Sequence, residues 1–269
     1  MNEITVNING VISKLSWTNI PELIKYASFQ INPFSNDKDI FFKEFEQSQL
    51  GAVNKILHFI PKLDKSKVKK IISVGSGIGT TELLLLQYFD NAELFLIDKE
   101  EITRPELIPD GELTPEIYRD RSNPRGFYNT WDVTKDAIQS SNLDKTKIHF
   151  LDPDDAWPDD VDLIISAYSW CWAYLKEVYW ERALKSLKID GVLMLDIYRL
   201  PNKDVAKEIS DELGSQPLKT HYFNIKTPFK SVRKKVDPNE PQPKNYFVQF
   251  FNPDEKGYYG GTFSWIRRK

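Results

Sequence analysis

Three glycines at alternate positions, Gly75, Gly77 and Gly79, lie in the stretch KIISVGSGIGTTELLLL. Glycine permits positive φ and lets another molecule approach the main chain without meeting a Cβ atom. The glycines follow a short β-branched run, typical of a buried strand, and precede Thr80 or Thr81, where a helix is expected to begin. The first turn of a helix offers unpaired N–H groups to an acceptor. This joint predicts a ligand site; the alternative is that the glycines serve only tight packing between strand and helix.

An acidic residue ends the next predicted strand. The run AELFLID spans residues 92–98, and Asp98 follows Gly79 by 19 residues. Ligands of open α/β sheets bind outside the carboxyl ends of the strands, where an acidic residue accepts hydrogen bonds from a ribose diol. The glycines and the acid together predict a ligand that contains a nucleoside.

The elements that must position these residues alternate along the chain. Apolar runs predict strands at 70–76, 92–98, 147–152, 162–169 and 191–198. Helical patterns lie between and after them, at 80–89, 134–143, 175–187 and 202–213. This alternation predicts a doubly wound, mostly parallel α/β sheet covered on both faces.

The two ends of the chain differ from this pattern. Residues 1–66 are expected to form an N-terminal helical extension, a cap or lid, because apolar residues recur at helical spacing before Pro61. After Leu213 strand follows strand, in PLKTHYFNI, NYFVQFF and GGTFSWIRR, and the last two are expected to form a hairpin. The sheet should therefore end in antiparallel strands.

The spacing of the glycines separates two ligand classes. In the dinucleotide fingerprint G-x-G-x-x-G the third glycine would fall at Thr80, whereas here VGSGIG places it one residue earlier. VGSGIG resembles motif I of the class I S-adenosylmethionine-dependent methyltransferases. The resemblance extends over roughly residues 68–200 and includes LFLIDKE, IHFLDPDDAWPDDVDLIIS and LKSLKIDGVLMLDIY. It implies a Rossmann-like domain over 67–269, with an insertion at 99–131 and a basic C-terminal β region at 215–269.

The resemblance also implies a cofactor, S-adenosyl-L-methionine, which is converted to S-adenosyl-L-homocysteine. The residues it assigns to the cofactor are Gly75, Ser76, Gly77, Gly79, Asp98, Lys99, Asp152 and Ser166. Asp154 or Asp155 are alternatives to Asp152 for the adenine amino group. The family usually has an acid two places before the first glycine, where this chain has Ser73. Glu82 either replaces that acid or complements the positive end of its helix.

The acceptor side is predicted from aromatic and basic residues. Trp170 and Trp172 either form an aromatic wall around an acceptor or pack the following helix. Tyr168 or Tyr174 is the candidate catalytic base, chosen by position. The insertion at 99–131, expected to be a lid or disordered, supplies further candidate acceptor contacts: Arg125, Tyr128 and Trp131.

Composition narrows the class of protein. Of 269 residues 28% are charged and 41% hydrophobic, which is typical of a globular chain. One cysteine, Cys171, and three histidines do not favour a disulfide or a zinc site, so no metal is expected. The sequence shows neither a signal peptide nor an apolar run long enough to cross a membrane, and we expect a cytoplasmic protein.

Charge is spread unevenly. From Lys219 onward there are 11 Lys and Arg against 4 Asp and Glu, although the net charge of the chain is −3. Such a basic region either binds phosphate, nucleic acid or an anionic membrane, or is simply solvated.

The leading hypothesis is methyl transfer to an oxygen of a small-molecule or glycan-like acceptor. No N-P-P-Y-type sequence follows the fourth strand, which argues against the base-amino methyltransferases that resemble one another there. One alternative is an RNA or DNA methyltransferase that uses the basic C-terminal region. Another is a methyltransferase-like module that binds cofactor or a partner without turnover, and a nicotinamide oxidoreductase is a third.

Overall fold

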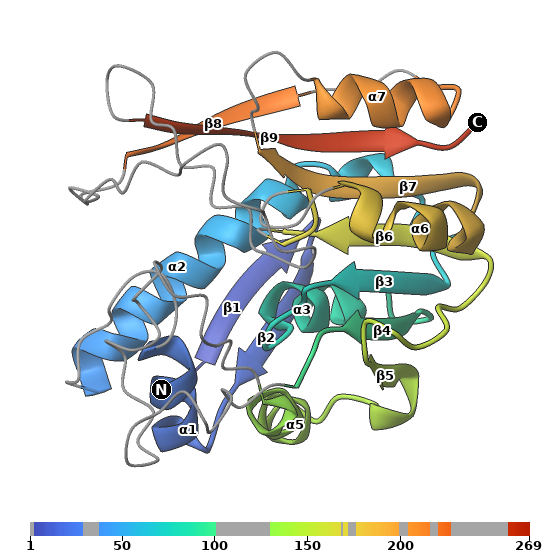
Figure 1. The fold of residues 1–269 in the computed structure, drawn as a ribbon. Helices are drawn as coiled ribbons and strands as arrows, with labels where there is room; N and C mark the ends of the chain where they lie inside the picture. Colours follow the sequence, from blue (N-terminus) through green and yellow to red (C-terminus); the bar gives the residue numbers. More distant parts are fainter. Residues whose placement is uncertain are drawn as a thin grey trace, which may run out of the picture.

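A seven-stranded sheet forms the centre of the molecule (Figure 1). The computed structural model describes residues 3–28, 38–100, 130–167, 169–171, 176–198, 204–215, 220–226 and 258–269. The strands of the sheet are β3 (Lys70–Val74), β4 (Glu93–Ile97), β5 (Ile148–Leu151), β6 (Val161–Ser166), β7 (Leu187–Tyr198), β8 (Thr220–Lys226) and β9 (Tyr258–Arg267). They lie side by side in the order β5-β4-β3-β6-β7-β9-β8.

Strand direction divides the sheet into two parts. The five strands from β5 to β7 are parallel, and β9 is antiparallel to both of its neighbours, β7 and β8. The predicted doubly wound, mostly parallel sheet that ends in antiparallel strands is therefore confirmed. The predicted strand NYFVQFF and its hairpin lie outside the described residues.

Both faces of the sheet are buried, which explains the continuous apolar character of the strands. Adjacent residues of one strand enter two different cores: Ile71 packs with one cluster and Ile72 with the other, and the same holds for Met194 and Leu195. Successive side chains of a strand point to opposite faces. A chain with one core on each face has to cover both faces with further elements.

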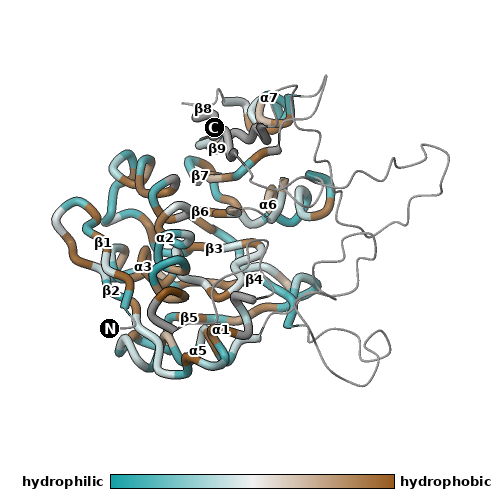
Figure 2. The backbone as a smooth tube through the Cα atoms, turned by 90° about the vertical axis from the view of Figure 1, so that its left-hand side faces the viewer, coloured by the Kyte–Doolittle hydropathy of each residue, from teal (hydrophilic) through white to brown (hydrophobic). Residues whose placement is uncertain are grey.

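The helices supply that cover. They are α1 (Ile20–Ser28), α2 (Lys38–Leu57), α3 (Thr80–Tyr88), α5 (Trp131–Ser140), α6 (Trp180–Ser186) and α7 (Val205–Glu212). Short 3-10 turns are η1 (Ile60–Lys62), η4 (Lys145–Lys147) and η5 (Lys176–Val178). Figure 2 shows α2 and α3 on one side of the central strands and α6 on the other.

The N-terminal segment corrects one prediction. Residues expected to be helical begin with a β-hairpin, β1 (Glu3–Ile8) paired antiparallel with β2 (Val11–Ser16), and helices follow only in α1 and α2. The hairpin follows from the period-two alternation of EITVNINGVISKLS, because every second side chain is buried. Asn9 and Gly10 both have positive φ, 51° and 88°, as a two-residue hairpin turn requires.

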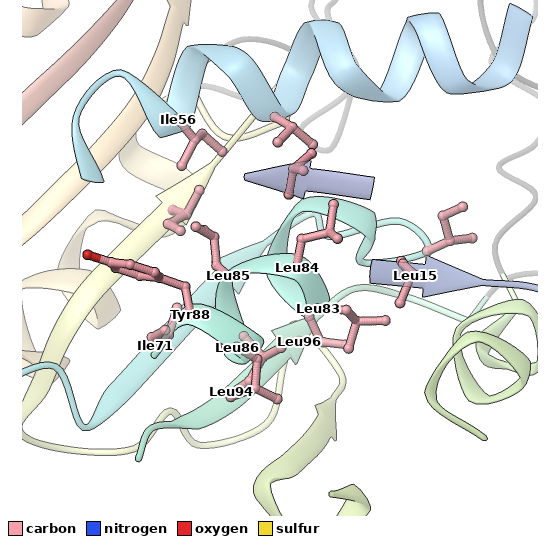
Figure 3. Packing of buried hydrophobic residues seen from close by; sticks show 14 of the residues in the cluster. Leu15, Ile56, Ile71, Leu83, Leu84, Leu85, Leu86, Tyr88, Leu94 and Leu96 are labelled. Atoms are coloured by element: carbon pink, nitrogen blue, oxygen red, sulfur yellow. The ribbon is translucent and has the colours of Figure 1, made fainter. Parts of the chain in front are cut away.

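This hairpin covers α3, which is buried on all sides. Leu83, Leu84, Leu85 and Leu86 are four consecutive buried leucines. A helix carries side chains all round its axis, so such a run needs apolar partners on both its inner and its outer side. Figure 3 shows sheet residues, the hairpin and α2 around these leucines. The N-terminal segment is therefore an integral layer of the main core.

Polar contacts hold the hairpin in place. The Gln87 side chain of α3 accepts a hydrogen bond from the Lys14 N–H at 2.9 Å and donates one to the Lys14 carbonyl at 2.7 Å. The amide thus pairs with the outer edge of β2 as a neighbouring strand would. On α5, the Asp136 carboxylate accepts hydrogen bonds from the N–H groups of Thr18 and Asn19, both at 2.8 Å.

Candidate functional site

The three glycines form the turn from β3 into α3, and each has positive φ. The values are 68° at Gly75, 54° at Gly77 and 68° at Gly79, a region that residues with a Cβ atom rarely adopt. The Gly75 N–H donates to the Ile97 carbonyl at 2.8 Å, which fastens the turn to the end of β4. The main chain of this turn therefore favours glycine at all three positions.

Other parts of the chain approach two of these glycines closely. A Cβ atom on Gly75 would lie 1.9 Å from Ser169 Oγ, and one on Gly77 would lie 2.6 Å from Tyr26 Oη. A Cβ on Gly79 would be 3.3 Å from the nearest side-chain atom, so the requirement there is mainly conformational. Packing within the chain thus accounts for part of the need for glycine.

Asp98 lies at the carboxyl end of β4 and is held rigidly. Its side chain is 7% exposed, and its carboxylate accepts hydrogen bonds from the Gly77 N–H at 2.7 Å and the Lys99 N–H at 2.8 Å. The predicted acid and the predicted glycine turn are therefore joined by a direct hydrogen bond. The carboxylate has a fixed orientation at the edge of the sheet where α/β proteins bind ligands.

Two hydroxyl groups beside the turn point to a hydrogen-bonding ligand. Within the described part of the chain, Ser76 Oγ and Thr80 Oγ1 are buried and have no hydrogen-bond partner. A buried hydroxyl without a partner is costly, and native structures usually satisfy such groups with protein, water or ligand. Ser76 was predicted as a cofactor contact, whereas Thr80 was considered only as a helix start.

Ser166 ends β6 and binds neighbouring backbone. It is fully buried; its hydroxyl donates to the Val74 carbonyl at 2.8 Å and accepts from the Trp170 N–H at 2.8 Å. The hydroxyl therefore ties the loop after β6 to the end of β3, just before the glycine turn. This placement brings the predicted residue to the site, where it supports the loop that carries Ser169.

The acidic loop after β5 is exposed and internally bonded. The Asp152 N–H donates to the Asp155 carboxylate at 2.8 Å, and the Asp152 side chain accepts from the Asp154 N–H at 3.0 Å. Arg182 of α6 reaches this loop, with 3.5 Å between its guanidinium and the Asp154 carboxylate, and it also donates to the Pro153 carbonyl. The three acids named as alternatives therefore belong to one turn.

Glu82 lies in the first turn of α3 and is buried beneath the glycine turn, with 4% exposure. Its carboxyl group accepts a hydrogen bond from Ser73 Oγ at 2.8 Å. Burial, together with the negative charge of Asp98, raises the pKa of Glu82 to about 7, and the hydrogen bond from Ser73 opposes this shift. Glu82 therefore contacts Ser73, which occupies the position where the methyltransferase family usually has an acid.

Two tyrosines at the site were not among the predicted site residues. Tyr26 of α1 places its hydroxyl beside Gly77, as described above. Tyr179 precedes α6, and burial followed by the negative charge of Asp98 raises its pKa to about 12. Tyr26 lies far from the glycine motif in the sequence, and no sequence pattern pointed to it. Tyr179 belongs to the aromatic-rich stretch SAYSWCWAYLKEVYW, which also contains Trp170 and Trp172.

Two predicted acceptor contacts lie in the cores instead. Trp131 is buried and packs on Phe150, with ring centroids 4.8 Å apart. Trp170 is completely buried between Tyr179 and Trp180, and its indole N–H donates to the Lys176 carbonyl at 2.9 Å. Trp131 belongs to one hydrophobic core and Trp170 to the other, and for Trp170 this favours the packing alternative. The remaining predicted residues lie outside the described residues: Arg125, Tyr128, Tyr168, Trp172 and Tyr174.

The described residues contain no group of three or more His, Cys, Asp or Glu side chains with an arrangement suited to a metal ion. In the same part of the chain, no helix combines the length and the apolar character that a membrane span needs.

Comparisons with known proteins find similarity of structure only. No family model matches the chain, and no curated protein matches it by sequence. An O-methyltransferase from a trans-AT PKS multienzyme of Brevibacillus brevis, in complex with S-adenosyl-L-homocysteine, is 14% identical, with a TM-score of 0.47 over 84% of this chain and 74% of that chain. Precorrin-6y C5,15-methyltransferase of Geobacter metallireducens is 12% identical, with a TM-score of 0.44 over 83% and 89%. TYW2 of P. horikoshii is 12% identical, with a TM-score of 0.42 over 100% and 72%. At such identity the similarity concerns the arrangement of the chain, and function has to be inferred from the site itself.

Proposed function

We propose that this chain is a class I methyltransferase that binds S-adenosyl-L-methionine at the carboxyl ends of β3 and β4. The observation that carries the proposal is the hydrogen bond between Gly77 N–H and the Asp98 carboxylate. It joins a glycine turn with positive φ to a buried acid at the place where α/β sheets bind nucleosides. The buried hydroxyls of Ser76 and Thr80 support a ligand rich in hydrogen-bonding groups.

The residues of the site fit such a ligand in a definite way. Asp98 would accept hydrogen bonds from the ribose hydroxyls, with its orientation fixed by the backbone of Gly77 and Lys99. Asp152, which directly follows β5, would accept a hydrogen bond from the adenine amino group. The bare main chain of the turn lets the amino-acid part of the ligand pass closely. When bound, the cofactor supplies a methyl group on a sulfonium, whose sulfur leaves with the bonding electron pair.

The chain's own contribution to such a displacement is mainly positioning and exclusion of water, because the leaving group is already good. We further propose a small-molecule or glycan-like acceptor that is methylated at oxygen. Its hydroxyl proton must pass to a base or to solvent as the new carbon–oxygen bond forms. The support for this finer assignment is the sequence after β6, which lacks an N-P-P-Y-type motif.

The first experiment is calorimetric titration of S-adenosyl-L-homocysteine into wild type and Asp98→Asn at pH 8. We expect binding to the wild type and at least about 10-fold weaker binding to the variant, since charge-assisted hydrogen bonds are lost. Failure of the folded wild type to bind would overturn the proposal.

Asp162 provides a matched control. It is also 7% exposed, and its carboxylate also accepts from two backbone N–H groups, those of Lys69 and Lys70 at 2.8 and 2.9 Å. It lies near the amino end of β6, whereas Asp98 lies at the carboxyl end of the parallel strand β4, so the two acids are at opposite ends of the strands. Asp162→Asn should reduce stability but leave the affinity unchanged. Equal losses of affinity in the two variants would show that Asp98 acts through the fold alone.

A further inference from the structure

Two elements outside the motif reach the glycine turn, and they are attached in different ways. The loop after β6 is fixed to the sheet through the Ser166 hydroxyl and the fully buried Trp170. The other element is α1, a nine-residue helix whose Tyr26 hydroxyl lies 2.6 Å from the position that a Cβ atom on Gly77 would take. Of the two, α1 is the one that can leave the turn without breaking the sheet.

The Asp136 carboxylate of α5 fastens the start of α1. It accepts hydrogen bonds from the N–H groups of Thr18 and Asn19, both at 2.8 Å, and from the Thr18 hydroxyl. Asn19 directly precedes α1, and its side chain accepts from the Glu22 N–H at 3.3 Å. These bonds to residues 18–19 form a clamp that is continuous with the first turn of α1. The charge of Asp136 makes each of them stronger than a neutral hydrogen bond.

Helix α5 gives this clamp a fixed base next to the site. Its first residue, Trp131, is buried against Phe150, and the Trp131 N–H donates to the Glu100 carboxylate at 3.1 Å. Glu100 follows Asp98 by two residues. The helix that holds α1 in place is therefore attached close to the acid that is proposed to bind the ligand.

The groups proposed to bind the ligand lie beneath α1 and the loop after β6. Asp98 is 7% exposed, and the hydroxyls of Ser76 and Thr80 are buried. Gly77, beside which Tyr26 lies, donates its N–H to the Asp98 carboxylate at 2.7 Å. A nucleoside therefore reaches Asp98 only after part of this cover has moved.

We propose that Asp136 is a positioning residue that holds α1 closed over the glycine turn, and that the ligand enters and leaves when this clamp opens. This inference rests on the proposed function and adds to it a route for the ligand. Because the clamp is formed in the closed protein with or without ligand, loosening it raises the open fraction of both by the same factor. The association and dissociation rate constants should rise together, and their ratio should stay the same.

The test measures both rate constants for S-adenosyl-L-homocysteine by surface plasmon resonance at pH 8. Asp136→Asn keeps the size of the side chain but removes its charge, and we expect both rate constants to rise about 10-fold. The dissociation constant should stay within about 2-fold of the wild-type value. If Asp136 acted on stability alone, the association rate constant of the folded variant would not change.

Asp144→Asn is the matched control. The Asp144 carboxylate also binds a threonine, accepting from the Thr146 N–H at 3.0 Å and the Thr146 hydroxyl at 2.7 Å, but it lies just before β5 and not on α1. Its rate constants should equal those of wild type. Tyr26→Ala removes the side chain that reaches the turn, so adding Asp136→Asn to it should change the rate constants by less than about 2-fold.

A second readout needs no ligand. Hydrogen exchange at the Gly77 amide of the free protein should be about 10-fold faster in Asp136→Asn, because α1 leaves the turn more often. Amides of β3 should exchange as in wild type, since the sheet does not open.

The outcomes separate the two proposals. If S-adenosyl-L-homocysteine does not bind to the folded wild type, the proposed function fails, and exchange at Gly77 still decides whether Asp136 holds α1 closed. If the ligand binds but Asp136→Asn leaves the association rate constant unchanged, the cofactor site stands and the role of Asp136 is refuted. Unchanged exchange at Gly77 in this variant would refute that role as well.

Discussion

At Gly75 the main chain passes against the loop after β6, and a Cβ atom there would lie 1.9 Å from Ser169 Oγ and 2.2 Å from Ser169 Cβ. The residue also has a φ of 68°. Two separate physical effects thus require glycine at one position, a steric one and a conformational one. They can be separated because the first depends on Ser169 and the second does not.

Gly75→Ala should lower the free energy of unfolding by about 2–4 kcal/mol, from overpacking plus left-handed strain. In a Ser169→Gly background the cost should fall to about 1–2 kcal/mol, since only the strain remains. Urea denaturation of the four proteins in this double-mutant cycle measures the difference. Additive effects would show that Ser169 does not obstruct residue 75.

Gly51 offers a control for this cycle. It lies exposed in α2, and a Cβ atom there would meet no atom within 4 Å. Gly51→Ala should therefore raise the free energy of unfolding by about 0.5–1 kcal/mol, as expected for alanine in a helix interior.

Among the elements, the β1–β2 hairpin and α1 are attached to the sheet domain through side chains that bind backbone groups. The Asp136 carboxylate of α5 accepts hydrogen bonds from Thr18 N–H, Asn19 N–H and the Thr18 hydroxyl. The segment between β2 and α1 thus depends on one side chain for several of its contacts. α1 in turn carries Tyr26 to the glycine turn.

Asp136→Ala should destabilise the protein by about 2 kcal/mol, because backbone donors lose a charged acceptor. It should also speed hydrogen exchange at the Thr18 and Asn19 amides more than at amides of β3. Asp132→Asn on the same helix serves as control, since its ion pair with Lys135 is long, 4.0 Å, and exposed. It should change stability by less than about 1 kcal/mol. Unchanged exchange at Thr18 in Asp136→Ala would contradict the anchoring role.

The strands of the sheet and helix α6 show which elements the sequence could predict and which it could not. The strands from β3 to β7 were predictable, because runs such as KIISV and DLIIS are continuously apolar, as strands buried on both faces must be. The helix expected at 175–187 is shorter: α6 begins at Trp180, and Leu187 starts β7. Helical spacing alone could not show where a strand takes over.

The hairpin was missed although it left two signals. EITVNINGVISKLS alternates with period two around Asn9 and Gly10, and four consecutive leucines in α3 require an outer layer. At the site, the glycine turn and Asp98 were predictable because both belong to one local motif. The contact of Glu82 with Ser73 and that of Tyr26 with Gly77 were not, because side-chain packing between elements decides them.

At the scale of the whole molecule, Glu82 links stability to pH. Its pKa in the folded protein, about 7, lies above the ordinary value of 4.5. The folded state therefore holds this proton more tightly than the unfolded chain does, and the resulting stability is fully present below pH 4.5 and is lost as pH rises to 7. Glu3, Asp64, Asp144 and Glu212 have lowered pKa values, so their contributions are lost only at more acidic pH.

The difference in unfolding free energy between wild type and Glu82→Gln should consequently change between pH 5 and pH 7.5. We expect wild type to lose roughly 2–3 kcal/mol relative to the variant over this range. Urea denaturation without ligand at both pH values measures the change. Parallel pH profiles for the two proteins would show that Glu82 does not titrate in this window.

The position of β9 has a consequence for how the protein is made. β9 lies between β7 and β8 in the sheet, although it is the last of the described strands along the chain (Figure 1). During synthesis β7 and β8 emerge from the ribosome first, and neither can pair with β9 until residues 258–267 have followed. Until then one edge of β7 carries unpaired backbone groups and can bind other nascent chains. Synthesis of residues 258–267 therefore converts this open edge of β7 into the interior of the sheet.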